Sequence, residues 1–107
     1  MIQAIYYRQY NRLTIEGHAH SDEPGKDLVC AGASTLAYTL AANVANLSDN
    51  GFVRDVTVKL EPGDTEIGCK AKSGSQVMVG RIFESVCVGF EILATNYPQY
   101  ISYEIRG

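Results

Sequence analysis

A histidine and a cysteine near the start of the chain have the types and spacing of a nucleophilic pair. His18 follows Gly17 at the end of a predicted strand, and Cys30 lies in the first turn of a predicted helix. Free N–H groups and partial positive charge at a helix start favour the thiolate. A neighbouring imidazole can take the thiol proton. The pair is therefore a candidate active site, with N–H groups of the helix start, including that of Cys30, as oxyanion donors.

The sequence around this pair has a recognisable pattern. It reads GHA at residues 17–19 and DLVCAGAS at residues 27–34. This pattern resembles the bacterial ribosomal-processing cysteine protease family, which carries a Gly-His-Ala, an Asp shortly before the Cys and a Ser four residues after it. The resemblance implies His18 and Cys30 as the catalytic dyad, with Asp27 and Ser34 as supporting residues. His20 stands where the family commonly has a small residue, and it is a rival base.

The same resemblance implies an activity, a partner and an oligomeric state. The chain is expected to be a cysteine endopeptidase that removes the N-terminal extension of large-subunit ribosomal protein twenty-seven. Its partner would be that ribosomal protein precursor, it would need no cofactor, and it would be a homodimer. An alternative from another class is a non-catalytic module that binds a ribosomal protein or precursor peptide. A third is a thiol redox protein, which the lack of a second cysteine near Cys30 disfavours.

Two residues of the pattern have alternative roles. Asp27 can cap the helix by accepting hydrogen bonds from its first N–H groups, or it can orient His18 as the third member of a triad. Capping is the favoured interpretation. Ser34, one turn after Cys30, can contact substrate or donate back to the Cys30 carbonyl.

Metal binding is the competing chemistry. His18, His20, Asp22 and Cys30 are side-chain types that bind zinc. No CxxC pair supports such a site, so no metal is predicted.

Length, charge and cysteine content limit the class of protein. The 107 residues suit one domain, residues 1–107. A net charge of −3 disfavours direct nucleic-acid binding and suits a basic peptide better. Three cysteines without paired spacing indicate a reducing compartment, and Cys69 and Cys87 are interpreted as core residues. No signal peptide and no apolar run of membrane length is read, so a cytoplasmic location without a membrane is expected.

The elements that must position the pair follow from hydrophobic periodicity. Strands are predicted at residues 2–9, 13–17, 52–60, 67–71 and 100–105, and helices at 27–50 and from 75 to about 97. The polar loop Ala19–Lys26 is either a lid or a plain surface connection. The first helix is rich in small residues and should pack on more than one side. The order ββαββα with a short C-terminal strand predicts an α+β fold, with two helices on a mostly antiparallel sheet.

Overall fold

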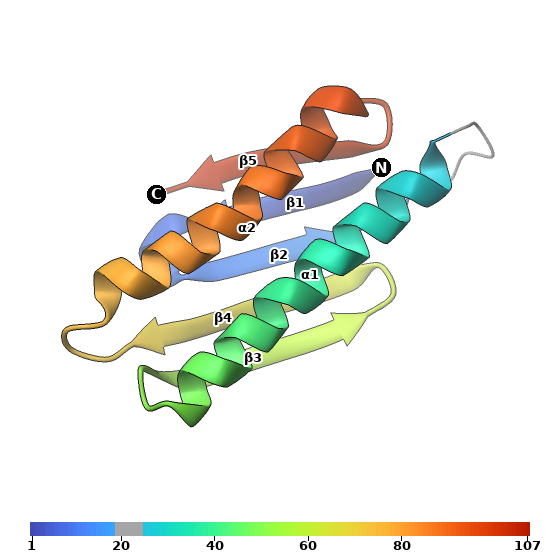
Figure 1. Ribbon diagram of the computed structural model, residues 1–107. Coiled ribbons are helices and arrows are strands. Elements are labelled where there is room, and N and C mark those ends of the chain that lie inside the picture. Colours follow the sequence, from blue (N-terminus) through green and yellow to red (C-terminus); the bar gives the residue numbers. More distant parts are fainter. Residues whose placement is uncertain (19–24) are drawn as a thin grey trace.

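A computed structural model describes residues 1–18 and 25–107 of the chain (Figure 1). Its elements are β1 (Ile2–Tyr7), η1 (Arg8–Tyr10), β2 (Arg12–Glu16), α1 (Lys26–Asp49), β3 (Val53–Glu61), β4 (Asp64–Ala71), α2 (Gln76–Asn96) and β5 (Ile101–Arg106). This order confirms the predicted α+β fold. A short 3-10 turn, η1, joins the first two strands, and Asn11 closes it in the left-handed conformation with φ of 48°.

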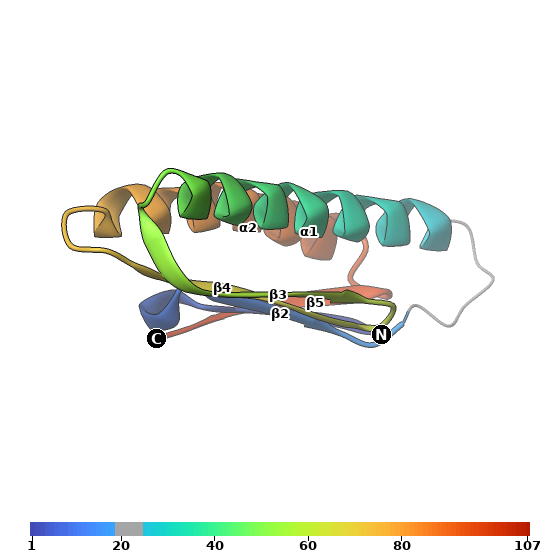
Figure 2. The same cartoon turned by 90° about the horizontal axis from the view of Figure 1, so that it is seen from below.

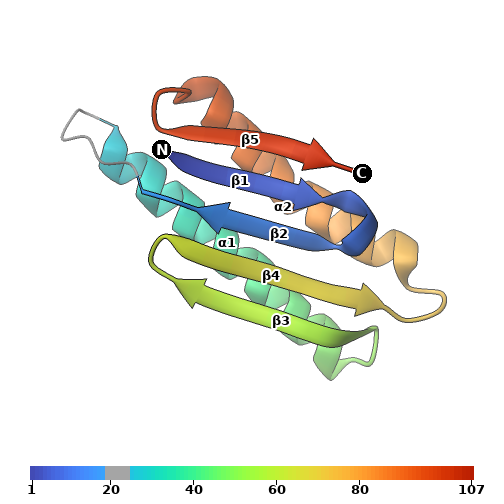
Figure 3. The same ribbon diagram turned by 180° about the vertical axis from the view of Figure 1, so that it is seen from behind.

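The five strands form one open sheet in the order β3-β4-β2-β1-β5 (Figure 3). Three of the four neighbouring pairs are antiparallel, and only β1 and β5 run parallel. The register places Leu13 of β2 opposite Ile67 of β4, and Ile2 of β1 opposite Ile101 of β5. The closing strand therefore lies at one edge of the sheet and β3 at the other.

Both α-helices cover the same face of the sheet, and in the described part of the chain no α-helix covers the other face (Figure 2). Strand β1 shows the expected alternation, because Ile2, Ala4 and Tyr6 are buried while Gln3 is exposed. The ring of Tyr6 stacks on Phe83 of α2, with ring centroids 6.1 Å apart. The hydrophobic core is thus a single layer between the sheet and the two helices.

Helices α1 and α2 approach each other closely at two glycines. A Cβ built on Gly32 would lie 3.2 Å from Cδ2 of Leu93, and one built on Gly89 would lie 2.8 Å from Cδ1 of Leu36. The side chain of Leu93 thus packs on α1 at Gly32, and the side chain of Leu36 packs on α2 at Gly89. This confirms the prediction that α1 packs on more than one side, against both the sheet and α2.

By length and composition alone, α1 would also suit a membrane span, because it has 24 predominantly apolar residues. The sequence prediction concerned an uninterrupted apolar run, and Ser34, Thr35 and Thr39 interrupt the apolar residues of this helix. The core helix of a soluble protein passes the same test. The fold accounts for the composition, since Val29, Leu40 and Val44 are completely buried in the core.

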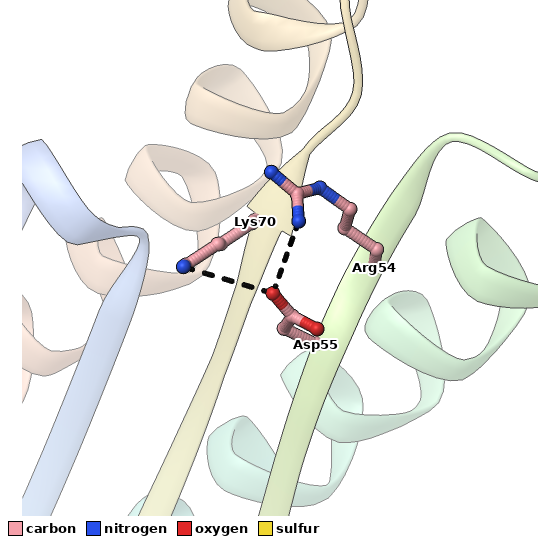
Figure 4. A network of polar contacts seen from close by, with 3 residues as sticks. All are labelled: Arg54, Asp55 and Lys70. Atoms are coloured by element: carbon pink, nitrogen blue, oxygen red, sulfur yellow. Dashed lines mark hydrogen bonds and ion pairs between the residues drawn. The ribbon is translucent and has the colours of Figure 1, made fainter.

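Strand β3 departs from regular pairing at a β-bulge. Asp55 and Val56 together lie opposite the single residue between Lys70 and Gly68 on β4, and Asp55 has φ of 52°. Its carboxylate accepts a hydrogen bond from Nη1 of Arg54 at 3.3 Å and lies 3.6 Å from Nζ of Lys70 (Figure 4). All three side chains are exposed, so these ion pairs add little stability. The regular part of β3 therefore runs from Thr57 to Glu61.

Candidate active site

A cavity of about 320 Å³ lies where the first half of α1 passes over the ends of β1 and β2 and the turn between β3 and β4. Three of the four site residues predicted from the sequence line it: His18, Cys30 and Ser34. Asp27 does not line it. Its other lining residues are Ile2, Ile15, Gly17, Ala33, Ala37, Tyr38, Leu60, Glu61, Pro62, Gly63 and Thr65. A thiol, an imidazole and a hydroxyl therefore share one largely apolar cavity.

Cys30 is the fifth residue of α1 and is half-buried. The sequence predicts Cys30 in the first turn of the helix, whereas in the structure it lies one position after that turn, because the helix begins at Lys26. The first intrahelical bond runs from the N–H of Val29 to the carbonyl of Gly25, at 3.0 Å. In a regular helix the N–H of Cys30 bonds in the same way to the carbonyl of Lys26. The N–H groups of the helix start that have no acceptor within the helix therefore precede Val29, and the role of the Cys30 N–H as an oxyanion donor stays a prediction.

The helix start is built on Gly25 rather than on Asp27. Gly25 is the N-cap, with φ of 98°, and no side chain caps the helix by a hydrogen bond. A Cβ at Gly25 would lie 3.3 Å from Cε1 of Tyr97, so both the backbone conformation and the packing favour glycine. The prediction that Asp27 is the cap is wrong. Asp27 is exposed in the first turn, where its charge is favourable to the helix dipole.

The backbone of His18 is held on both sides. Its carbonyl accepts a hydrogen bond from the ammonium of Met1 at 2.8 Å, and the N–H of Gly17 donates to the carbonyl of Gly63 at 3.0 Å. Gly17 has φ of 94°, and a Cβ there would collide with the Met1 carbonyl oxygen. The glycine before the histidine therefore lets β2 end against the start of β1 and the β3–β4 turn.

The imidazole of His18 packs directly on Gly63. A Cβ built on Gly63 would lie 3.0 Å from Cδ2 of His18 and closer still to Nε2 and Cε1. Gly63 also has φ of 73°, which favours glycine independently of the contact. The sequence predicted a turn at residues 61–64 but gave no signal that this turn supports the histidine, because the contact is between distant parts of the chain.

The hydroxyl of Ser34 makes no hydrogen bond within residues 1–18 and 25–107. The neighbouring Thr35, in contrast, donates to the carbonyl of Ala31 at 2.8 Å. Of the two roles predicted for Ser34, back-bonding to Cys30 is therefore not observed. The exposed hydroxyl remains available on the cavity wall.

Other lining residues were missed by the sequence analysis. Tyr38 is 60% exposed and follows Cys30 and Ser34 at four-residue intervals, so helical periodicity could have placed it on their face. Leu60, Glu61 and Thr65 belong to the β3–β4 hairpin. Nothing in their sequence pattern indicates that the hairpin reaches the cysteine.

Several predictions concern residues outside the described parts of the chain. His20, the rival base, and Asp22, one of the zinc-ligand candidates, are among them, as is most of the predicted lid, Ala19–Lys26. In the parts that are described, no group of three or more His, Cys, Asp or Glu side chains could hold a metal ion. Cys69 and Cys87 are buried and unpaired, which confirms their interpretation as core residues.

Within the described residues, the thiol of Cys30 and the imidazole of His18 line the same cavity without a hydrogen bond between them. Catalytic hydrogen bonds are often long before substrate binds. A thiol beside an imidazole in an apolar cavity near a helix start can perform nucleophilic attack on a carbonyl carbon.

Comparisons with known proteins agree with this chemistry. The family model described as "Cysteine protease Prp" matches residues 1–102. The fold is similar to that of SMU.848 from Streptococcus mutans, with 28% identity, a TM-score of 0.71 and coverage of 99% of this chain and 94% of that one. It is also similar to the essential ribosomal processing protease Prp from S. aureus with a covalently linked product peptide, at 19% identity, a TM-score of 0.70 and coverage of 98% and 97%. No curated protein matches the sequence.

Proposed function

The chain belongs to the cysteine protease Prp family, and from this premise we propose that it is an endopeptidase with Cys30 as nucleophile and His18 as general acid and base. The observation that carries the proposal is the shared cavity, which His18 and Cys30 both line although they come from different parts of the chain. Asp27 and Ser34 keep supporting roles. Ser34 can contact bound peptide from the cavity wall, whereas Asp27 can act only from outside it.

The proposed reaction has two steps. His18 takes the proton of Cys30, the sulfur bonds to the scissile carbonyl carbon, and the carbon–nitrogen bond breaks as the amine takes the proton from His18. A water molecule then gives a proton to His18 and attacks the acyl-enzyme, which releases the new carboxyl terminus and returns the thiol. N–H groups that precede Val29 at the start of α1 are the free donors near the developing oxyanion.

The proposed substrate is the precursor of large-subunit ribosomal protein twenty-seven, cleaved after its N-terminal extension. The family and the name of the S. aureus ribosomal processing protease support this choice. A structure of the S. aureus protein in complex with a substrate peptide, at 18% identity and a TM-score of 0.68, supports a peptide as the substrate of this chain. We further propose that the protein acts in the cytoplasm as a homodimer, without a cofactor, a membrane or direct nucleic-acid contact.

The test is mass spectrometry of the precursor after incubation with the protein. We expect cleavage by the wild type and none by Cys30→Ala, because the nucleophile is missing. Cys69→Ala is the matched control: it also removes one thiol, from the core, and should retain cleavage apart from a stability loss of about 1 kcal/mol. Binding of the intact precursor without cleavage would instead support the non-catalytic interaction module. Cleavage by Cys30→Ala at the wild-type rate would contradict the proposed nucleophile.

A further inference from the structure

One edge of the sheet ends beside the candidate active site. Among the described strands, β3 pairs only with β4, so its other side is a free edge. Helix α1 crosses the sheet obliquely, from the start of β1 and the end of β2 to the start of β3 (Figure 1). Val53, at the start of β3, is therefore buried, whereas Val58 is 44% exposed. The helix thus leaves uncovered the half of β3 that leads to the cavity.

The side chains of this uncovered half continue the wall of the cavity. Val58 pairs in register with Ile67 of β4, and Leu60 pairs with Thr65. Directly opposite residues of an antiparallel pair lie on the same face of the sheet. Ile67 is completely buried under the helices, and Leu60 and Thr65 both line the cavity. Val58 therefore lies on the cavity side and extends the apolar wall along the edge.

The hydrogen bonds of the sheet show which backbone groups of β3 face the free edge. The N–H of Cys69 donates to the carbonyl of Asn11 at 3.2 Å, so Cys69 of β4 bonds away from β3. Because this direction alternates along an antiparallel strand, Ile67 also bonds toward β2. Its partner Val58 therefore forms a non-hydrogen-bonded pair with β4. The N–H and C=O groups of Val58, and those of Leu60 two residues later, point to the free edge.

We propose that the free edge of β3, residues 57–61, binds a segment of the substrate as an additional strand. The inference rests on the proposed function, because it assigns how the substrate of that same site is held. Unpaired N–H and C=O groups of an edge strand are a template for an extended chain. The segment would pair with Val58 and Leu60. The residues next to it would then pass Leu60 into the cavity that Cys30 lines.

The shape of the edge favours a peptide over a second copy of the chain. The bulge at Asp55 interrupts the regular pairing of β3, and Lys59 lies in the middle of the regular stretch. Bulges and lysines are features that protect edge strands from pairing with another sheet. A flexible peptide needs only the short regular stretch, and it can continue into the cavity beside it. A strand of a second folded copy cannot turn into the cavity in this way.

The first measurement compares two peptides that contain the cleaved bond of the ribosomal protein precursor. The long peptide has about five residues more on each side than the short one, enough to cover the regular edge of β3. We expect the wild type to cleave the long peptide with about tenfold higher kcat/KM, because each net hydrogen bond corresponds to about two- to tenfold. In Val58→Pro this ratio should fall toward one, since proline removes the outward N–H and blocks pairing. That N–H faces away from β4, so the substitution breaks no hydrogen bond of the sheet.

Ile105→Pro is the matched control on the opposite edge strand, β5. The N–H of Ile2 donates to the carbonyl of Tyr100, so Tyr100 and every second residue after it bond toward β1. The N–H of Ile105 therefore also points to a free edge, and its side chain is 52% exposed. Ile105→Pro should keep the wild-type ratio of long to short peptide. This separates an effect of the β3 edge from a general effect of proline in an edge strand.

A second measurement needs no variant of the protein. Each backbone nitrogen of the long peptide outside the cleaved bond is methylated in turn, and kcat/KM is measured with the wild type. The rate should fall at every second position of one segment, because alternate N–H groups of a bound strand face its neighbour. Losses without this alternation, or the same ratio of long to short peptide in the wild type and in Val58→Pro, would overturn the inference alone.

Two further outcomes are informative. If Val58→Pro keeps the ratio but lowers the molecular mass in sedimentation, the edge is occupied by a second copy, which also overturns the inference. If the wild type cleaves neither the precursor nor any peptide, the proposed function fails and this inference with it.

Discussion

The position of His18 depends on two glycines that lie far apart in the sequence. Gly17 lets β2 end against the carbonyl group of Met1, just before β1, and Gly63 leaves room for the imidazole on the β3–β4 turn. Both positions have a positive φ, so glycine is favoured there by the backbone conformation as well as by the lack of room for a Cβ atom. The effect of the positive φ can be separated from the effect of the close contact, because other glycines of the chain have a positive φ and no atom close to a built Cβ.

Gly63→Ala should reduce activity far more than it reduces stability. The new methyl group would push the imidazole away from its place, and a shift of about 1 Å in a catalytic group can cost on the order of a hundredfold in rate. The positive φ adds a loss of about 1–2 kcal/mol in the free energy of unfolding. The measurements are kcat/KM with a peptide that spans the cleaved bond of the ribosomal protein precursor, and the free energy of unfolding in urea.

Gly51→Ala is the control for this variant. Gly51 has φ of 77°, close to the 73° of Gly63, and a Cβ there would have no atom within 4 Å. It should lose a similar amount of stability and keep its activity. Equal activity in the two variants would mean that the contact between Gly63 and His18 does not position the base.

At the scale of single residues, the sequence predicts the reactive side chains better than it predicts the residues that position them. His18 and Cys30 are recognisable from their types and spacing, Ser34 is implied by the family resemblance, and the structure places all three along one cavity. Gly63 could not be found in this way, because its contact with His18 depends on how β4 pairs with β2. Asp27 was misjudged for a local reason: aspartate is a good N-cap, but Gly25 and its left-handed conformation begin the helix earlier.

At the scale of elements, the packing of α1 on α2 sets where the cysteine helix lies. The contact uses Gly32 on one helix and Gly89 on the other, each facing a leucine side chain. Glycine lowers helix stability by about 0.5–1 kcal/mol relative to alanine. A glycine inside a helix therefore lowers its stability unless close packing offsets the loss. Helix α2 contains one glycine with such packing, Gly89, and one without it, Gly80.

Gly80→Ala should stabilise the protein, and Gly89→Ala should not. A Cβ at Gly80 would have no atom within 4 Å, so the full gain in helix propensity of about 0.5–1 kcal/mol is expected. A Cβ at Gly89 would collide with the side chain of Leu36, and overpacking of a core costs about 1–3 kcal/mol. The free energies of unfolding in urea give the comparison. An equal gain in both variants would show that Leu36 moves aside without cost.

The elements themselves follow from periodicity, whereas their arrangement does not. The apolar stripe of α2, with Val79, Phe83 and Phe90, is visible in the sequence and is buried in the structure. The position of β5 beside β1, parallel to it, could not be predicted, because it depends on where α2 crosses the sheet. The alternation of apolar residues does break at the bulge of β3, because Arg54 and Asp55 are two consecutive polar residues between valines. Such a break does not by itself distinguish a bulge from the end of a strand.

At the scale of the whole molecule, one buried layer holds every core side chain, because both helices cover the same face (Figure 2). That layer includes titratable groups that the proposed mechanism does not use. Burial raises the pKa of the Cys87 thiol from 9.0 to about 11 and that of Tyr6 from 10.0 to about 12. Burial and the nearby charge of Cys87 also raise the pKa of Tyr103. These groups stay protonated in the folded protein after they have ionised in the unfolded chain.

The stability of the protein should therefore fall in alkaline solution. A group whose pKa is raised by folding contributes its full stability below the unfolded value and loses it as the pH rises through the folded value. For Cys87 the loss starts near pH 9 and ends near pH 11, and by pH 10 it amounts to about 1 kcal/mol. Below pH 10 the tyrosines contribute little, since their unfolded pKa is 10.0.

Urea unfolding of the wild type and of Cys87→Ala between pH 8 and pH 10 tests this account of the core. Cys87→Ala should be less stable than the wild type at pH 8, because it leaves a small cavity. The free energy of unfolding of Cys87→Ala should fall less steeply with pH than that of the wild type. The thiol that ionises in the unfolded chain and stays protonated in the folded protein is missing from this variant. A smaller slope should remain from Cys69, whose pKa is also raised by burial. If Cys87→Ala showed the same slope as the wild type, the buried thiol would not be the source of the alkaline instability.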